Sequence, residues 1–89
     1  MIERELLVTN HLGLHARATA RLVQLLSGYR CNVTLTAKGR EVNAKSIMGV
    51  MLLAAGPGMT LLLRADGPDE TNAVTAVADL FERKFDEES

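Results

Sequence analysis

His15 and Arg17 are the residues of this chain whose types and spacing indicate chemistry. His15 stands where a helix is expected to begin, at a position that normally holds Ser, Thr, Asp or Asn to cap free backbone N–H groups. With that cap missing, the helix dipole, the Arg17 guanidinium and three amides would form an anion site beside an imidazole. The expected amides are those of Ala16, Arg17 and Ala18. The pattern predicts a phosphoryl site with His15 as the nucleophile.

The surroundings of His15 support this chemistry on physical grounds. Positive charge favours the neutral imidazole, which leaves a ring nitrogen free to attack phosphorus, and it then favours the dianionic phosphate once attached. Gly13 permits the tight or left-handed backbone that brings the ring over the helix end. A competing interpretation makes His15 a surface residue at a helix start and Arg17 a solvated charge.

A second segment begins at Ser46, which is a good N-cap for a short helix over residues 47–53. This helix is apolar almost all round, too much so for a one-sided helix, and we expect some of its side chains to be exposed as an adaptable docking patch. The alternatives are that all of them lie in the core and that Ser46 is only a cap, worth about 1 kcal/mol. The expected docking residues are Ile47, Met48, Met51 and Arg21.

A metal site has little support in the sequence. His11 and His15 are four residues apart, which on a helix would suggest two ligands, but Gly13 indicates a loop and no nearby Cys or carboxylate completes a set. We therefore expect no metal and no cofactor. Cys31, the single cysteine, alternates with core residues and is expected to be a small buried apolar group.

The elements that must position these residues follow the order βαββαβα. Alternation of apolar and polar residues predicts strands over residues 2–9 and 31–37. The turn at Lys38-Gly39 predicts a hairpin into a third strand over residues 40–44, and a fourth strand is expected over residues 59–65, after the stop at residues 56–58. Helical spacing predicts helices over residues 16–27 and 47–53 and a last helix that opens at residues 67–70. The expected buried stripes are Ala20, Val23 and Leu26 in the first helix, and Ala73, Val74, Val77, Phe81 and Phe85 in the last. Strands with one wet face and one-sided helices predict one sheet covered on one face, an α+β fold.

The composition fits one folded domain over residues 1–89, with residues 86–89 expected to be a frayed, solvated tail. The 89 residues are 47% hydrophobic and 24% charged, which excludes a disordered or low-complexity chain. No apolar run approaches the roughly 18 residues of a membrane span, and a secretory pattern is missing, so we expect a cytoplasmic protein without a membrane partner. A net charge of −1 and the lack of Trp argue against nucleic-acid binding.

Both motifs match one known family. The active-site signature of the HPr family, the histidine phosphocarriers of the bacterial phosphoenolpyruvate-dependent phosphotransferase system, closely resembles Gly13-Leu14-His15-Ala16-Arg17. The regulatory serine segment of that family resembles Lys45-Ser46-Ile47-Met48-Gly49-Val50-Met51. The two motifs lie at the family's spacing, and the resemblance extends through all seven predicted elements.

The resemblance implies a fold and a function. It implies an open-faced sandwich with a four-stranded antiparallel sheet and three helices on one face. His15 would be phosphorylated on Nδ1 by enzyme I and would pass the group to an enzyme IIA domain, with Arg17 holding the phosphoryl oxygens. The chain would be a carrier rather than an enzyme, a monomer, and a target of HPr kinase/phosphorylase at Ser46.

The chain also departs from the family pattern. Ala18 and Thr19 replace the usual Pro and Ala, which returns an N–H to the first helical turn. Leu12 replaces the Asn of some sugar-branch members, and residues 10–13 and 85–87 look more like nitrogen-branch relatives, so the branch stays open.

Two other functions remain as alternatives. The first is a regulatory protein-binding module of nitrogen or carbon metabolism, in which Ser46 and the adjacent apolar patch dominate and His15 is dispensable. The second is a small nucleic-acid or ligand-binding α+β domain, against which the near-neutral charge counts.

Overall fold

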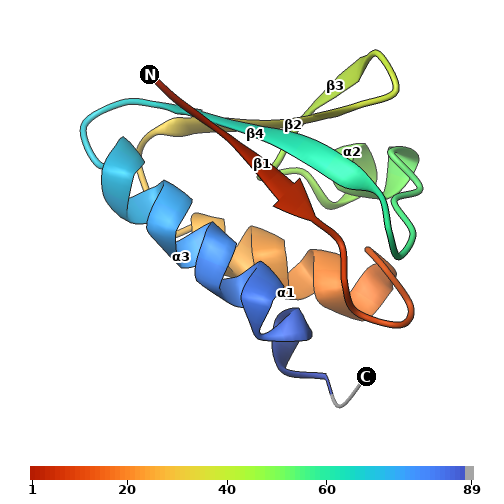
Figure 1. Cartoon of the computed structure of the whole chain (residues 1–89). Coiled ribbons are helices and arrows are strands. Elements are labelled where there is room, and N and C mark those ends of the chain that lie inside the picture. Colours follow the sequence, from red (N-terminus) through yellow and green to blue (C-terminus); the bar gives the residue numbers. More distant parts are fainter. Residues whose placement is uncertain (88–89) are drawn as a thin grey trace.

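A single four-stranded sheet organises the molecule, and its strands and helices follow the predicted order. The computed structural model describes residues 1–87. Its elements are β1 (Ile2–Leu7), α1 (Ala16–Leu26), β2 (Asn32–Ala37), β3 (Arg40–Asn43), α2 (Ile47–Leu52), β4 (Thr60–Asp66), α3 (Glu70–Glu82) and a 3₁₀ turn at Lys84–Asp86. In Figure 1, α1 and α3 lie side by side below the sheet, and the short α2 is drawn higher, near one end of β4. The expected α+β sandwich is confirmed.

The sheet is antiparallel throughout, with the spatial order β1-β4-β2-β3. β4 and β2 therefore form its centre, and every second side chain along them is buried. The predicted hairpin closes through Lys38 and Gly39, both with positive φ, as a two-residue turn between twisted strands requires. β1 is an edge strand whose alternation holds only in part, since Glu3, Arg4 and Glu5 are all exposed.

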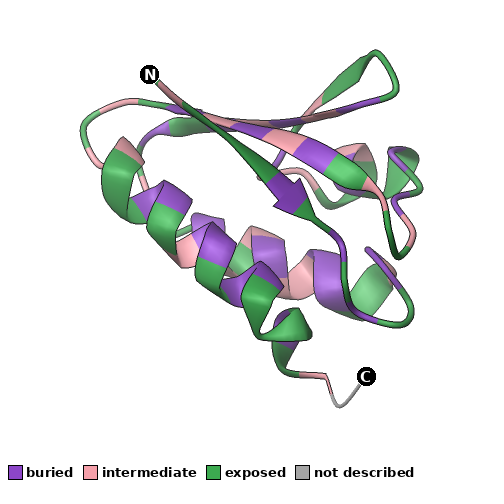
Figure 2. Cartoon of the chain, in the orientation of Figure 1, coloured by how far each residue is buried: buried purple, intermediate pink, exposed green. Residues whose placement is uncertain are grey.

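The core lies between the sheet and the helices, and the purple stretches of ribbon in Figure 2 mark its buried residues. The stripe expected on α3 is confirmed, and its last member, Phe85, is buried beyond the end of the helix. The stripe expected on α1 was wrong in two positions, because Ala20 and Val23 are only half-buried. The buried residues of α1 are Ala18, Thr19, Leu22 and Leu26.

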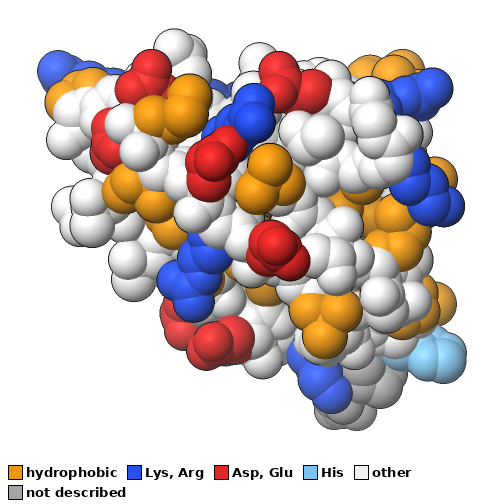
Figure 3. Space-filling view, turned by 45° about the horizontal axis from the view of Figure 1, so that its top comes forward, with side chains coloured by type: hydrophobic (Ala, Val, Ile, Leu, Met, Phe, Trp, Pro, Cys, Tyr) orange, Lys and Arg blue, Asp and Glu red, His pale blue; other side chains and the backbone are white. Residues whose placement is uncertain are grey.

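The outer face of the sheet carries charges of both signs close together (Figure 3). Arg64 on β4 pairs with Glu3 on β1 and lies 3.4 Å from a Glu41 carboxylate oxygen on β3. This face therefore offers mixed ion pairs and no continuous basic stripe. Among residues 1–87, none of the helices has the length and apolar character needed to cross a membrane.

Candidate functional site

His15 is the N-cap of α1, and its own ring supplies the cap. The backbone N–H of Arg17 donates to His15 Nδ1 over 3.2 Å, while the backbone of His15 is extended, as at an ordinary N-cap. The expectation of an uncapped helix was thus wrong for the Arg17 amide, because the imidazole takes the place of a Ser or Asp side chain. Since Nδ1 accepts this hydrogen bond, it carries a lone pair and the ring proton belongs on Nε2.

The loop before α1 is fixed by close packing. Gly13 has φ +64°, and a Cβ there would lie 2.4 Å from the carbonyl oxygen of Ala55. The next residue, Leu14, donates its N–H to the same carbonyl over 2.9 Å. Thr19 donates its hydroxyl to the carbonyl of Leu14 over 3.1 Å in the core. This bond gives a structural reason for Thr at a position where the resembled family usually has Ala.

The second nitrogen of the His15 ring contacts the carboxylate of Glu87, which the sequence had not suggested. His15 Nε2 lies 2.5 Å from Glu87 Oε2, and the second oxygen, Oε1, accepts from Asn10 Nδ2 over 2.9 Å. The side chain of Glu87 is only 14% exposed. Burial by itself raises the pKa of Glu87, but the hydrogen bonds from Asn10 and His15, with the Arg21 charge, hold that pKa below its ordinary value.

The C-terminal segment returns to the helix end through an unusual turn. Lys84, Phe85 and Asp86 have φ values of 55°, 58° and 60°, which are left-handed without any glycine. Phe85 anchors the turn, with its ring 4.8 Å from that of Phe81. Arg21 donates from Nη1 to the Phe85 carbonyl. The predicted frayed tail was therefore wrong at Asp86 and Glu87, and residues 88–89 lie outside the described part.

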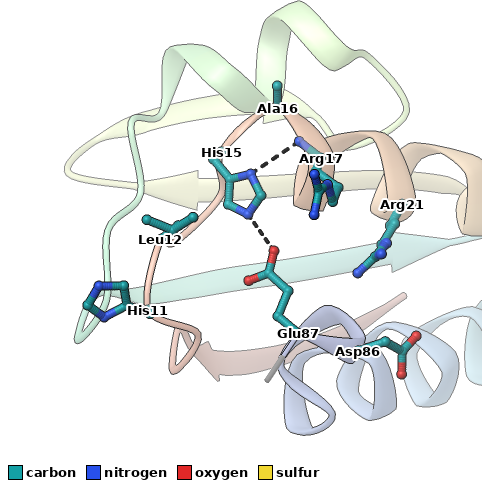
Figure 4. A pocket seen from close by; sticks show the side chains of 8 residues that line it. All are labelled: His11, Leu12, His15, Ala16, Arg17, Arg21, Asp86 and Glu87. Carbon is teal, nitrogen blue, oxygen red and sulfur yellow. Dashed lines mark hydrogen bonds and ion pairs between the residues drawn. The ribbon is translucent and has the colours of Figure 1, made fainter. Parts of the chain in front are cut away.

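These groups surround an open hollow of about 610 Å³. Figure 4 shows the His15 ring between the first turn of α1 and the Glu87 carboxylate. The lining residues are His11, Leu12, His15, Ala16, Arg17, Arg21, Asp86 and Glu87. The His15 side chain is 25% exposed, so a phosphoryl donor can reach the ring. Two guanidinium groups and the start of a helix in one hollow favour an anionic ligand.

The second predicted segment forms α2, and no residue of this helix lines the hollow. Ser46 caps this helix, accepting the Gly49 N–H over 3.1 Å. Val50 is buried, whereas four apolar residues of the helix are exposed: Ile47, Met48, Met51 and Leu52. Of the four expected docking residues, Arg21 lines the hollow and Ile47, Met48 and Met51 do not. Within residues 1–87, His11 and His15 belong to no group of three or more metal-ligating side chains.

Comparison with known proteins identifies the family. The family model described as "PTS HPr component phosphorylation site" matches residues 2–83. This chain belongs to the HPr family. Over all 89 residues of both chains it is 61% identical to a phosphocarrier protein HPr of Xylella fastidiosa. The resemblance inferred from the two motifs is confirmed. The role that this resemblance implied, a phosphocarrier of the phosphotransferase system, is confirmed with it.

Solved structures share the fold. HPr-C-His from Thermoanaerobacter tengcongensis superposes with a TM-score of 0.96 at 42% identity, covering 100% of both chains. A second structure from that organism, described as an HPr dimer, gives 0.79 at 41% identity and covers 98% of this chain and 100% of its own. HPr-type chains are therefore also found as dimers, which bears on the expected monomer.

Proposed function

We propose that this chain accepts a phosphoryl group from phospho-enzyme I on His15 Nδ1 and donates it to an enzyme IIA domain. The observation that supports it most directly is the position of Nδ1, which carries a lone pair and faces the first amides of α1 at 3.2 Å from the Arg17 nitrogen. A nucleophilic nitrogen at a helix N-terminus can attack phosphorus while the helix end stabilises the oxygens. The protein is then a carrier that is modified and discharged, not an enzyme that turns over a substrate.

Positioning and charge supply most of what such a transfer needs. Phosphoryl transfer passes through a loose transition state whose charge is spread over three oxygens. When Nδ1 takes the phosphoryl group, it gives up the Arg17 amide, which becomes free to donate to a phosphoryl oxygen together with the amides of Ala16 and Ala18. The exposed Arg17 guanidinium lies in the same hollow and adds a second set of donors.

The exposed apolar side chains of α2 are the proposed docking surface for enzyme I and the IIA domain. Met48 is 74% exposed, and methionine adapts to partners of different shape. Ser46 at the start of the same helix is the proposed target of HPr kinase/phosphorylase. A phosphate there would meet a helix N-terminus without unfolding it, so inhibition would act on docking.

The decisive experiment is phosphorylation by a purified enzyme I. Incubated with phosphoenolpyruvate and magnesium, the native chain should gain one acid-labile phosphoryl group by mass spectrometry, and His15→Ala should gain none. If the native chain stays unlabelled, or if His15→Ala labels equally, the carrier proposal fails. In that case the regulatory binding module would be favoured, since it needs Ser46 and the α2 surface but not His15.

We propose the monomer as the working form, because one copy of the chain supplies His15, two arginines and a helix N-terminus to the hollow, so the proposed chemistry needs no second copy. Light scattering after size-exclusion chromatography should give the mass of one chain across a range of protein concentrations. A constant dimer mass would contradict this proposal without touching the role of His15. The cytoplasm, expected from the sequence, stays a prediction.

A further inference from the structure

Glu87 makes a contact that lies outside both sequence motifs. It is beyond residues 2–83, over which the family model matches. Its two carboxylate oxygens are used separately, one on His15 Nε2 and the other on Asn10 Nδ2. A side chain that is 14% exposed and bonded through both oxygens is part of the site and not of a solvated tail.

The position of Glu87 is fixed from several sides. Asn10 is fully buried and also donates to the Gly13 carbonyl over 2.7 Å, so its amide is tied to the loop that carries His15. Phe85, 1% exposed, anchors the preceding turn in the core, and Arg21 binds its carbonyl. The carboxylate is therefore held before any phosphoryl donor arrives.

We propose that Glu87 is a positioning residue for phosphoryl transfer: its carboxylate keeps the ring proton of His15 on Nε2 and leaves the lone pair on Nδ1. This inference rests on the proposed carrier function. A carboxylate that accepts a proton from one imidazole nitrogen fixes both the tautomer and the orientation of the ring. The Arg17 amide, which donates to Nδ1, supports the same tautomer from the other side.

The arrangement allows transfer in both directions without moving a proton. In the forward step the Nδ1 lone pair forms the new bond to phosphorus, and the bond from phosphorus to the donor breaks, with its electron pair leaving on the donor. The ring keeps its Nε2 proton and becomes a cation, whose charge Glu87 offsets. In the reverse step the Nδ1–phosphorus bond breaks, its electron pair returns to Nδ1, and a neutral imidazole leaves.

Without the carboxylate, the phosphorylated ring would more readily lose its Nε2 proton to water. The leaving group would then resemble an imidazolate anion, which leaves phosphorus less easily than neutral imidazole does. The other ionisable groups that line this hollow are His11, Arg17, Arg21 and Asp86. Both arginines are cationic and disfavour a ring cation, whereas Glu87, which contacts the ring, favours it. The Asp86 carboxylate is paired with Arg83.

The test compares the native chain with Glu87→Gln, using Glu82→Gln as the control. A glutamine keeps the shape of Glu87 but has one acceptor oxygen for two donors, and it carries no charge. Glu82 is an exposed residue of α3, and its replacement removes the same charge. We expect transfer from phospho-enzyme I and to an enzyme IIA domain to slow roughly tenfold in Glu87→Gln, as for a lost charge-assisted hydrogen bond. The control should match the native chain.

A second measurement needs no partner protein. In unphosphorylated, ¹⁵N-labelled native chain at a pH where the ring is neutral, NMR should show the His15 proton on Nε2, shifted downfield and slow to exchange with water. In Glu87→Gln this proton should exchange fast, and the pH profile of phosphoryl discharge should move to lower pH. A native His15 protonated on Nδ1, or equal transfer rates and profiles in the two chains, would overturn the inference. Labelling of His15 by enzyme I would still uphold the carrier function.

Discussion

At the scale of single residues, His15 has two roles that are separable by substitution. It caps α1 through Nδ1, and the same nitrogen is the proposed nucleophile. An N-cap hydrogen bond is worth about 1 kcal/mol, so the unphosphorylated ring stabilises α1 by about that amount. Phosphorylation would remove this cap and replace it with phosphoryl oxygens, which are stronger acceptors at the same helix end.

Two variants of His15 should separate its capping of α1 from its acceptance of the phosphoryl group. His15→Ala loses both, and its free energy of unfolding in urea should fall by about 1 kcal/mol. His15→Asn restores a good capping side chain and should unfold close to the native chain, yet neither variant should accept a phosphoryl group. Equal unfolding free energies for the alanine and asparagine variants would show that the ring does not cap the helix in solution.

Arg17 should matter for rate and not for stability. Because its side chain is exposed, Arg17→Ala should change the free energy of unfolding by less than about 0.5 kcal/mol. Phosphoryl transfer should slow on the order of 100-fold, since a donor to the transition-state oxygens is lost. Rapid-quench measurements with phospho-enzyme I would check the rate, and Arg30→Ala, also an exposed arginine, is the control. An unchanged rate would remove Arg17 from the site.

At the scale of elements, α2 is a helix whose exposed side is more apolar than stability requires. Its core contact comes from Val50, and its exposed side carries Met48 and Leu52 at 74% and 60% exposure. A cluster of exposed apolar side chains on one helix is typical of an interaction surface.

Met48→Ala should therefore weaken docking without weakening the fold. Its free energy of unfolding should stay within about 0.5 kcal/mol of native, because little area is buried. The KM for this chain as a substrate of enzyme I should rise several-fold, while kcat changes little. Leu7→Ala, on edge strand β1 and 53% exposed, is the matched control. An equal rise in KM for both variants would contradict a docking role specific to α2.

Sequence patterns predicted the elements well where one periodicity dominates. β2 alternates strictly and β4 follows the stop at residues 56–58, and both were located within about one residue. The apolar residues of α1 occur on several sides, so the packing partners decide which are buried. The chemistry of His15 could be proposed from its place at a helix start. Glu87 could not, because its approach depends on a left-handed turn of three residues without glycine, for which the sequence carries no signal.

At the scale of the whole molecule, the site depends on segments far apart in sequence. The loop after β1, the start of α1 and the C-terminal turn meet at one end of the molecule (Figure 1). The strand order β1-β4-β2-β3 makes this possible but does not follow from periodicity; it agrees with the fold that the family resemblance implied.

The contact of Asp69 with the segment before β2 should make the free energy of unfolding depend on pH. Asp69, just before α3, accepts from the backbone N–H groups of Arg30 and Cys31, each over 2.9 Å, ahead of β2. The Arg30 bond is the main cause that holds the pKa of Asp69 below its ordinary value; partial desolvation opposes it and the Cys31 bond adds to it. A carboxylate with a lowered folded pKa stabilises the fold above its unfolded pKa of about 4, and this is lost as pH falls through the folded pKa.

Asp69→Asn should therefore flatten the acid limb of the stability curve. Urea unfolding between about pH 5 and pH 2 should show a smaller loss of free energy in the variant than in the native chain. Asp79→Asn, an exposed carboxylate of α3, is the control for the change in net charge. If the native chain and Asp69→Asn lose stability in parallel over this range, the Asp69 contacts do not govern it.

The contact of Gly13 with Ala55 joins two regions that lie some forty residues apart in the chain. Ala55 follows the end of α2, and Gly13 precedes His15, so displacement of one loop meets the backbone of the other. Any coupling between docking on α2 and phosphorylation of His15 through this contact would have the same size in both directions. A partner that shifts the Ala55 loop on docking would then also shift the loop that carries His15, and phosphorylation of His15 would change the affinity of α2 for that partner.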